Sequence, residues 1–310
     1  MAQSQPDGVW VDGSHLALIP SGPAIIGTLD EETLTAVQRD TPWYDVRRIE
    51  AARREPVVPA FLLGKFPVTC AQFASFLNDT GATRVGSDAS VGGVVVATDV
   101  VAWLKTRRES EGPHAVGVFL DGESGWAPHR DSADLPMTLV TWFGADLYAK
   151  RFGARLPTEL EWEKAARGED GLRFPWGNDY EPGRANLADY WAGHAVNTQS
   201  DWDLKFSQEE NGPAWLASRP TPSGSFRRGL SPYGVEDMIG NVAEWCDDVY
   251  DASSEGGRAD FRAMRGAGRY GYLAIARCAT RRRRAPESVG ENLGFRIAVS
   301  PASRITSDGV

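Results

Sequence analysis

Residues 155–167 read Arg-Leu-Pro-Thr-Glu-Leu-Glu-Trp-Glu-Lys-Ala-Ala-Arg, and residues 233–246 read Tyr-Gly-Val-Glu-Asp-Met-Ile-Gly-Asn-Val-Ala-Glu-Trp-Cys. The first stretch predicts a helix that begins after Thr158, because the threonine hydroxyl can accept a hydrogen bond from a free backbone amide. Glu161, three residues later, can reach back to complete a capping box. Gly168 then stands where a helix commonly ends. We therefore expect a helix between Thr158 and Gly168.

Outside these motifs, the sequence predicts two more helices and two apolar strands. Residues 59–69 form a short strand signal, and apolar side chains recur at helical spacing in the following stretch, Cys70 to Asp79. A second apolar stripe covers Thr138 to Phe152, and Leu293 to Val299 is a final strand signal. Two or three helices against a small, loop-rich antiparallel sheet make an α+β pattern.

The composition is that of a globular protein. Among 310 residues, 33 basic side chains stand against 42 acidic ones, a net charge of −9. No apolar run of about 18 residues occurs, and the first residues lack a basic start with an apolar core, so we expect a cytoplasmic protein without a membrane partner. We expect one domain over residues 1–310, with insertions near 84–134 and 195–220.

Cysteines and histidines give no sign of a zinc module or a disulfide framework. Cys70, Cys246 and Cys278 are far apart, and no CxxC pair or HxxxH spacing occurs. The interior is instead marked by tryptophans and by charges that persist inside a protein only when paired. These residues are Trp162, Trp176, Trp245, Glu161, Arg167 and Arg296.

Four motifs in a fixed order carry a resemblance. They are residues 155–167, Phe174–Asn178, residues 233–246 and Leu293–Arg296. Together they resemble the formylglycine-generating enzyme (sulfatase-modifying factor) family, over roughly Val11 to Ser300. The resemblance implies a C-type lectin-like fold, with much irregular structure around a small sheet. Because this family includes enzymes and binding proteins, the fold leaves the function open.

The resemblance also implies where a catalytic site would be. The enzymes of the family use two cysteines that bind copper(I), a soft ion that oxygen ligands hold poorly. With Arg277-Cys278-Ala279 aligned on the family pattern, these cysteine positions are Gly268 and Leu273. We therefore expect no bound copper and a non-catalytic, ligand-binding protein.

Two alternatives stay open. The first is a metal-dependent oxidoreductase or maturation enzyme that reuses the pocket without the cysteine pair and enlists His194 or Tyr270. The second is a scaffold in a larger bacterial assembly.

The resemblance further implies a structural calcium site in the turn at residues 237–244. The ligands would be the side chains of Asp237 and Glu244 and the backbone carbonyls of Gly240 and Val242, a donor set that suits calcium. In the alternative, the two carboxylates cap local backbone or pair with arginine. A second family site would use Asn186 and the Leu187 carbonyl, but its third ligand falls in the insertion near 195–220.

Positive charge is concentrated in one segment. Nine arginines and one acid, Asp260, lie between Arg258 and Pro286. Part of this charge matches positions that the family uses internally, such as Arg277 and Arg281. A solvated basic patch is the simplest interpretation of the remainder. Nucleic-acid binding is not expected, because the arginines are not interleaved with aromatic residues that stack on bases.

A second resemblance gives residues 265–296, here called the display segment, a sharper interpretation. The segment is similar to the variable region of diversity-generating retroelement proteins, which present altered residues on a lectin-like surface. Tyr and Arg suit such surfaces, so we expect a protein partner or another ligand, with acidic groups favoured. The expected ligand-binding residues are Arg269, Tyr270, Gly271, Tyr272, Ala274, Arg282, Arg283, Arg284, Glu287, Val289 and Glu291.

Overall fold

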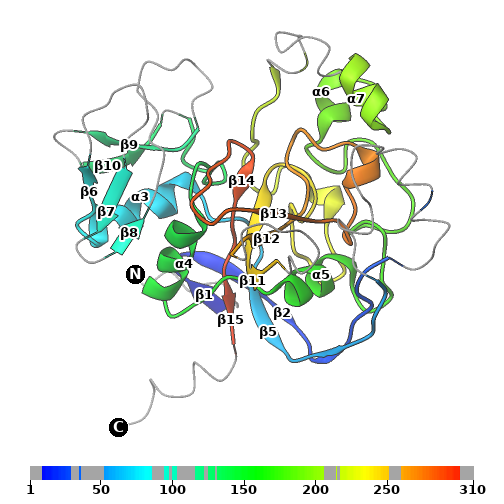
Figure 1. Cartoon of the computed structure of the whole chain (residues 1–310), viewed down its shortest axis with the longest axis horizontal. Coiled ribbons are helices and arrows are strands. Elements are labelled where there is room, and N and C mark those ends of the chain that lie inside the picture. Colours follow the sequence, from blue (N-terminus) through cyan, green and yellow to red (C-terminus); the bar gives the residue numbers. More distant parts are fainter. Residues whose placement is uncertain are drawn as a thin grey trace, which may run out of the picture.

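The computed structural model describes residues 9–28, 35, 52–85, 94–97, 100–102, 116–121, 125–129, 131–205, 214, 217–250 and 260–300. Arg258 and parts of both expected insertions lie outside these residues. Within them the fold is mixed α and β, with few helices, small sheets and long irregular connections (Figure 1).

One four-stranded sheet joins both ends of the described chain. Its order is β1-β2-β5-β15, and all its neighbours are antiparallel. On β2, Ile19 is buried while its neighbour Leu18 is exposed, as expected for a sheet with one face toward the core. The strands are β1 (Val9–Val11), β2 (Ser14–Ile19), β5 (Phe61–Gly64) and β15 (Ala298–Val299).

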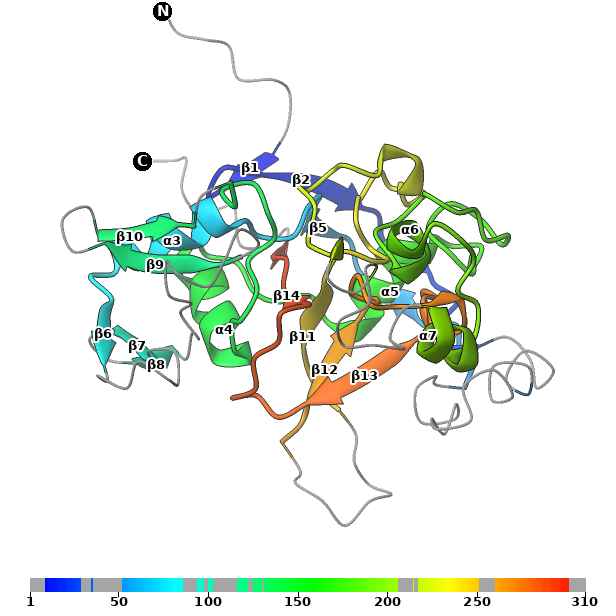
Figure 2. The same cartoon turned by 90° about the horizontal axis from the view of Figure 1, so that it is seen from above.

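A second four-stranded sheet has the order β13-β12-β11-β14, and the display segment supplies β13, β14 and the last residue of β12. The sequence predicts a purely antiparallel sheet, but β14 pairs with β11 in parallel. Figure 2 shows its strands spreading across the middle of the molecule. They are β11 (Ala243–Val249), β12 (Arg262–Arg265), β13 (Arg281–Arg284) and β14 (Leu293–Gly294).

The single final strand expected over Leu293–Val299 is two short strands in different sheets. β14 pairs with β11, whereas β15 pairs with β5. Between them the Arg296 side chain turns inward to Glu244. Gly294 makes the crossing possible, because a side-chain carbon at this residue would lie 2.6 Å from the carbonyl oxygen of Met137.

The three expected helices are present, and their starts follow from hydroxyl caps. The capping box between Thr158 and Glu161 forms at the start of α5 as predicted, and Thr69 makes a similar one for α3. The middle helix begins later than Thr138, because Thr141 accepts a hydrogen bond from the Gly144 amide. These helices are α3 (Cys70–Asp79), α4 (Trp142–Arg151) and α5 (Glu159–Arg167).

Two short helices and several small hairpins complete the described structure. The expected insertion near 84–134 carries strands, and its β9–β10 hairpin packs on α3 through Asn78, which bonds the backbone of Trp126. The short helices are α6 (Ala188–Ala192) and α7 (Gln199–Lys205), with 3-10 turns η1 (Arg227–Gly229) and η2 (Leu273–Ile275). The remaining strands are β3 (Gly22–Pro23), β4 (Val57–Val58), β6 (Thr83–Val85), β7 (Val94–Ala97), β8 (Val100–Ala102), β9 (Val118–Asp121) and β10 (Gly125–Pro128).

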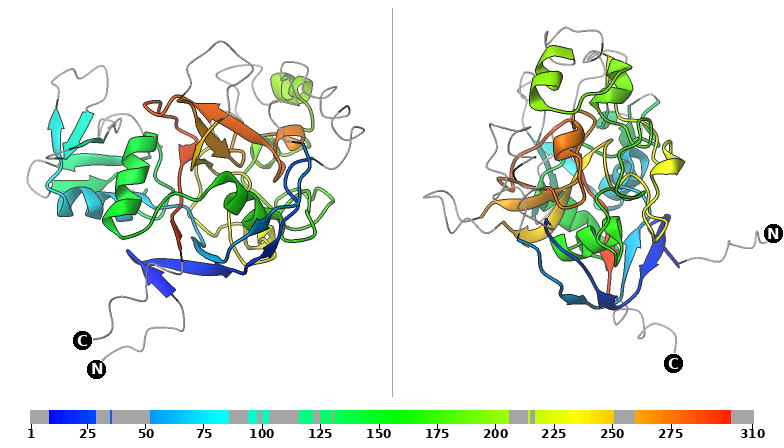
Figure 3. Two further views of the ribbon diagram at one scale, coloured as in Figure 1. Left: turned by 60° about the horizontal axis from the view of Figure 1, so that its bottom comes forward. Right: turned by 90° about the vertical axis from the view of Figure 1, so that its right-hand side faces the viewer.

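The core lies between the two four-stranded sheets. In the left view of Figure 3, the green α5 lies between the blue strands below and the orange strands above. Trp162 of α5 and Trp245 of β11 are fully buried, as predicted, whereas Trp176 is only partly buried. No helix among the described residues is long and apolar enough to cross a membrane.

Candidate functional site

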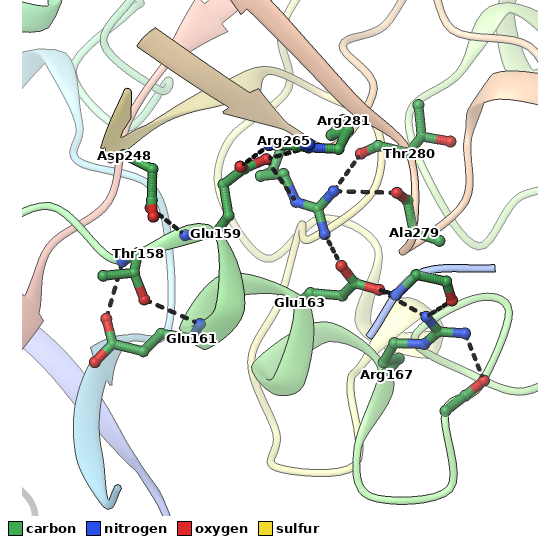
Figure 4. Close-up of polar contacts among 12 residues, drawn as sticks. Thr158, Glu159, Glu161, Glu163, Arg167, Asp248, Arg265, Ala279, Thr280 and Arg281 are labelled. Carbon is green, nitrogen blue, oxygen red and sulfur yellow. Dashed lines mark hydrogen bonds and ion pairs between the residues drawn. The ribbon is translucent and has the colours of Figure 1, made fainter. Parts of the chain in front are cut away.

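Arg265 on β12 is the centre of a buried ion-pair network that ties the display segment to α5 (Figure 4). Its guanidinium pairs with Glu163 and donates to the carbonyl oxygens of Ala279 and Thr280, at 3.1 Å each. Arg265 is 1% exposed, and these contacts replace water at its two terminal nitrogens, whereas the buried Nε has no hydrogen-bond partner. Arg265 therefore belongs to the interior and not to a solvated basic patch.

Two further pairs extend this network along α5. Arg167 donates to Glu163 at 2.6 Å, and Arg281 of β13 pairs with Glu159 at the start of the helix. Because a buried charge is tolerated only with a partner, α5 and the strands β12 and β13 constrain each other. Much of the positive charge of residues 265–281 thus holds the fold together.

A second buried ion pair joins the turn at residues 237–244 to Arg296, which lies between β14 and β15. Arg296 donates to both carboxylate oxygens of Glu244, at 2.6 and 2.7 Å, and Trp162 Nε1 donates to the same carboxylate at 2.8 Å. Arg296 and Glu244 have no exposed surface. This is the alternative in which the turn carboxylate pairs with arginine.

Asp237 likewise caps local backbone. One of its oxygens accepts a hydrogen bond from the Gly224 amide at 2.9 Å, and burial raises the pKa of its carboxyl to about 6. Among the described residues no three His, Cys, Asp or Glu side chains are grouped to hold a metal. Glu244 is engaged by Arg296 and Trp162, and Asp237 accepts one hydrogen bond from the Gly224 amide. Calcium binding by the Asp237 and Glu244 side chains and the Gly240 and Val242 carbonyls stays a prediction.

Asn186, the expected residue of a second calcium site, is also fully engaged. Its amide donates to the Arg219 carbonyl oxygen, at 3.0 Å, and to Asn241, while its oxygen accepts from Trp191 at 2.6 Å. This side chain therefore ties α6 to the 237–244 turn.

The backbone is closed around one position where the family's enzymes carry a cysteine. A side-chain carbon on Gly268 would lie 2.8 Å from Asn292 Cβ and 2.9 Å from the Asn292 carbonyl oxygen. Contacts below 3 Å force a rearrangement, so Asn292 fills the space that a thiol would need. No signal in the sequence around Gly268 points to Asn292, which lies 24 residues away along the chain.

The three cysteines of the chain do not replace the missing pair. Cys70, Cys246 and Cys278 are all buried and unpaired to one another. Burial raises the pKa of the Cys70 and Cys278 thiols to about 12, and that of Cys246 well above its usual value. Since only the thiolate is a nucleophile or a good metal ligand, these thiols are inert at neutral pH.

The first half of the expected ligand-binding residues is not at the surface. Arg269, Tyr272 and Ala274 are each less than 10% exposed, Gly271 is buried, and Tyr270 is half-buried. In this structure these residues are therefore covered, and their part in ligand binding stays a prediction. The physical reason is that α7 and the turn before it cover this stretch of backbone.

Arg269 is held in place by its own neighbours. It donates to the Glu291 carbonyl oxygen at 2.6 Å and to the Tyr270 hydroxyl at 2.5 Å, with its guanidinium 4.3 Å from the centre of the Tyr270 ring. A cation now occupies the place where the family pattern has a tryptophan. The structure therefore gives Arg269 a packing role.

The second half of the expected residues is accessible. Arg284, Glu287 and Glu291 are exposed, and Arg282, Arg283 and Val289 are partly exposed. Arg283 lies over the ring of Phe261 at 4.9 Å. All six lie on β13 and on the connection to β14. Because successive strand residues point to opposite faces, Arg283 leaves β13 on the other face from Arg282 and Arg284. These six accessible residues are here called the 282–291 surface.

The residues named for an alternative enzyme do not converge on a reactive group. His194 is exposed on the turn after α6, whereas Tyr270 is committed to Arg269. The cover over residues 270–274 was missed as well, although residues 198–201, Thr-Gln-Ser-Asp, have the spacing of a helix cap. That signal could have located α7.

Comparisons with known proteins agree with these motifs. Residues 4–301 match the family described as "Sulfatase-modifying factor enzyme 1-like domain". The chain is 30% identical over 276 residues to "Inactive C-alpha-formylglycine-generating enzyme 2" of Bos taurus, covering 84% of this chain and 83% of that protein. It is 33% identical over 268 residues to "Formylglycine-generating enzyme" of Streptomyces coelicolor, covering 77% of each.

Solved structures agree on the fold. PvdO from Pseudomonas aeruginosa superposes with a TM-score of 0.58 at 20% identity, covering 96% of this chain and 99% of that one. "Treponema denticola variable protein 1" superposes with a TM-score of 0.52 at 17% identity, covering 93% and 95%. The mixed α+β architecture is thus the C-type lectin-like one, and the protein is a member of the sulfatase-modifying factor enzyme 1-like (formylglycine-generating enzyme) family.

Proposed function

We propose that this protein is a non-catalytic, ligand-binding member of its family. The observation that carries the proposal is the closed backbone at Gly268. The family's copper site needs a thiol there, and Asn292 leaves no room for any side chain. A glycine that replaced a cysteine without other changes would leave a cavity, whereas here Asn292 fills the space. The second position, Leu273, belongs to the 3-10 turn η2 and also lacks sulfur.

The ligand surface would be the accessible 282–291 surface. It combines arginine, glutamate and an apolar valine on one strand and one connection, and arginine is a residue type that protein-binding surfaces favour. Side chains there can change with little effect on the core, because Arg284, Glu287 and Glu291 are exposed. In the sharper form of the proposal, diversity-generating retroelement chemistry varies these residues, and the partner is a protein with acidic groups.

A copper titration tests the non-catalytic part. Purified protein is titrated with copper(I) against a chromophoric chelator, and is then mixed with a cysteine-containing peptide in air. An active formylglycine-generating enzyme serves as the positive control. We expect no copper retained against the chelator and no conversion of the peptide cysteine to formylglycine. One retained equivalent of copper, or formylglycine in the peptide, would support the metal-dependent enzyme instead.

The gene surroundings test the diversified form. A near-copy of the sequence encoding residues 265–296, with mismatches at adenines and a neighbouring reverse transcriptase gene, is the expected arrangement. Mismatches should then fall on codons of the 282–291 surface rather than on Arg269, Tyr272 or Ala274. Mismatches restricted to those buried residues would contradict the assignment of the surface.

A further inference from the structure

The short helix α7 lies directly against the 270–275 part of the display segment. Figure 2 shows the green helix beside the orange turn η2. Trp202 Nε1 donates to the Tyr270 carbonyl oxygen at 2.8 Å, and the Tyr272 hydroxyl donates to Gln199 Oε1 at 2.9 Å. Both contacts come from the side of α7 that faces the loop, whereas Leu204 of the same helix is 57% exposed.

The residues just before α7 also form backbone hydrogen bonds with the same loop. The Leu273 amide donates to the Val196 carbonyl oxygen and the Ala274 amide to that of Asn197, each at 3.1 Å. Four hydrogen bonds therefore join residues 196–202 to residues 270–274. Residues 196–202 belong to the expected insertion near 195–220 and lie outside the family motifs.

These contacts form a satellite of the core. The buried residues Ala188, Val196, Tyr272, Ala274 and Ile275 make a separate cluster, with Trp202 and Tyr270 packed against it. The core has two large buried clusters, one around α3 and α4 and one around α5, and neither shares any of these side chains. Removing α7 would therefore uncover an aromatic and apolar patch without opening the main interior.

The helix also has its own N-terminal cap. Thr198 Oγ1 accepts a hydrogen bond from the Asp201 amide at 3.1 Å, and Asp201 Oδ2 accepts from the Asn197 and Thr198 amides. None of these bonds involves the loop that α7 covers. The cap therefore does not depend on contact with the loop.

We infer that α7 is an autoinhibitory cover, which closes the Tyr270–Ile275 loop in the structure seen here and exposes it on opening. This deepens the proposed function, on which it rests, by giving the protein a second, conditional ligand surface. An opened loop presents Tyr270, Tyr272 and Ile275 beside the Arg269 guanidinium. Such a face fits a protein partner with an apolar side chain next to a carboxylate.

The native thiols make a clean labelling experiment possible. Because Cys70, Cys246 and Cys278 are buried with raised thiol pKa values, they should stay silent toward a maleimide. Ala274→Cys places one reporter thiol under the cover. Its labelling rate is measured alone, with Trp202→Ala, and with the matched control Leu204→Ala on the exposed side of α7.

We expect slow labelling of A274C alone and with L204A, and a rate at least tenfold higher with W202A, which removes a hydrogen bond and the ring packing. Hydrogen exchange of the Leu273 and Ala274 amides in W202A and L204A gives the same readout without a substitution in the loop. Equal rates in W202A and L204A would overturn the cover. So would fast labelling of A274C alone, or simultaneous labelling of Cys278, which would mean general loosening.

The labelling uses no ligand, so its failure is separate from failure of the proposed function. Retained copper or formylglycine in the peptide would refute the non-catalytic function and leave the cover in place. Unchanged labelling would refute the cover and leave the accessible 282–291 surface as the ligand site.

Discussion

Replacing Arg265 by methionine tests whether the positive charge of the display segment holds the fold together. Met keeps much of the side-chain length and removes the guanidinium. The lost contacts are the ion pair with Glu163 and the hydrogen bonds to the carbonyl oxygens of Ala279 and Thr280. Each buried acceptor that loses its donor costs about 1–3 kcal/mol.

The magnitude follows from what remains after the change. Glu163 keeps Arg167 at 2.6 Å and the Gly27 amide at 2.8 Å, so its charge is still partly compensated. Breaking one partner out of a buried pair typically costs about 3–5 kcal/mol. The remaining contacts of Glu163 place the cost of the broken ion pair near the lower end, at about 3 kcal/mol. The two carbonyl oxygens that lose their donor make this figure a lower bound.

Urea unfolding followed by tryptophan fluorescence measures this loss. Arg284→Met is the matched control, because it makes the same chemical change on an exposed side chain whose contact to Val289 is 3.4 Å long. We expect R284M to change the free energy of unfolding by less than about 0.5 kcal/mol. A loss below about 1 kcal/mol for R265M, or an equal loss for both variants, would refute the structural role.

Three further predictions follow from the geometry. Ellman's reagent at pH 8 should find no reactive thiol in the folded protein and three in urea, since burial raises the pKa of Cys70 and Cys278 to about 12. A thiol that reacts rapidly in the folded protein would show that a cysteine is accessible. Gly268→Ala should destabilise the protein by about 1–3 kcal/mol through overpacking against Asn292, measured as a lower urea midpoint, whereas unchanged stability would mean that the position is open. In calcium-free buffer the unfolding free energy should fall as pH rises from about 4 to 6, because a carboxyl with a raised pKa favours the folded state only when protonated. Asp237 should contribute up to about 3 kcal/mol to this fall, and Asp237→Asn should lack that contribution. A rise in unfolding temperature on adding calcium that D237N abolishes would establish the calcium site instead.

Local signals in the sequence were enough for the helices and for the family. The Thr158 cap, the repeat of apolar residues from Cys70 to Asp79, and the paired charges at Arg167 and Arg296 depend on neighbours a few residues away or on the need to neutralise a buried charge. The predicted helix starts at Thr138, whereas α4 starts four residues later, at Trp142, because Thr141 caps it.

The candidate site depended on residues far apart in the chain. The resemblance to diversified variable regions, together with the tyrosine and arginine content, predicted that Tyr270 and Tyr272 are displayed. Their exposure depends on Trp202 and Gln199, which lie about 70 residues earlier and contact them. No pattern within residues 265–296 can report that cover.

The amino-acid sequence by itself determined the family, the three main helices and the absence of a thiol at Gly268 and Leu273, because motifs, caps and residue identity are properties of short stretches. Only the tertiary structure decided which arginines hold the interior and which reach solvent, and that Asn292 closes the space at Gly268. The physical reason is that burial and ion pairing depend on which distant segments pack together, and the strength of each charge contact follows from that packing.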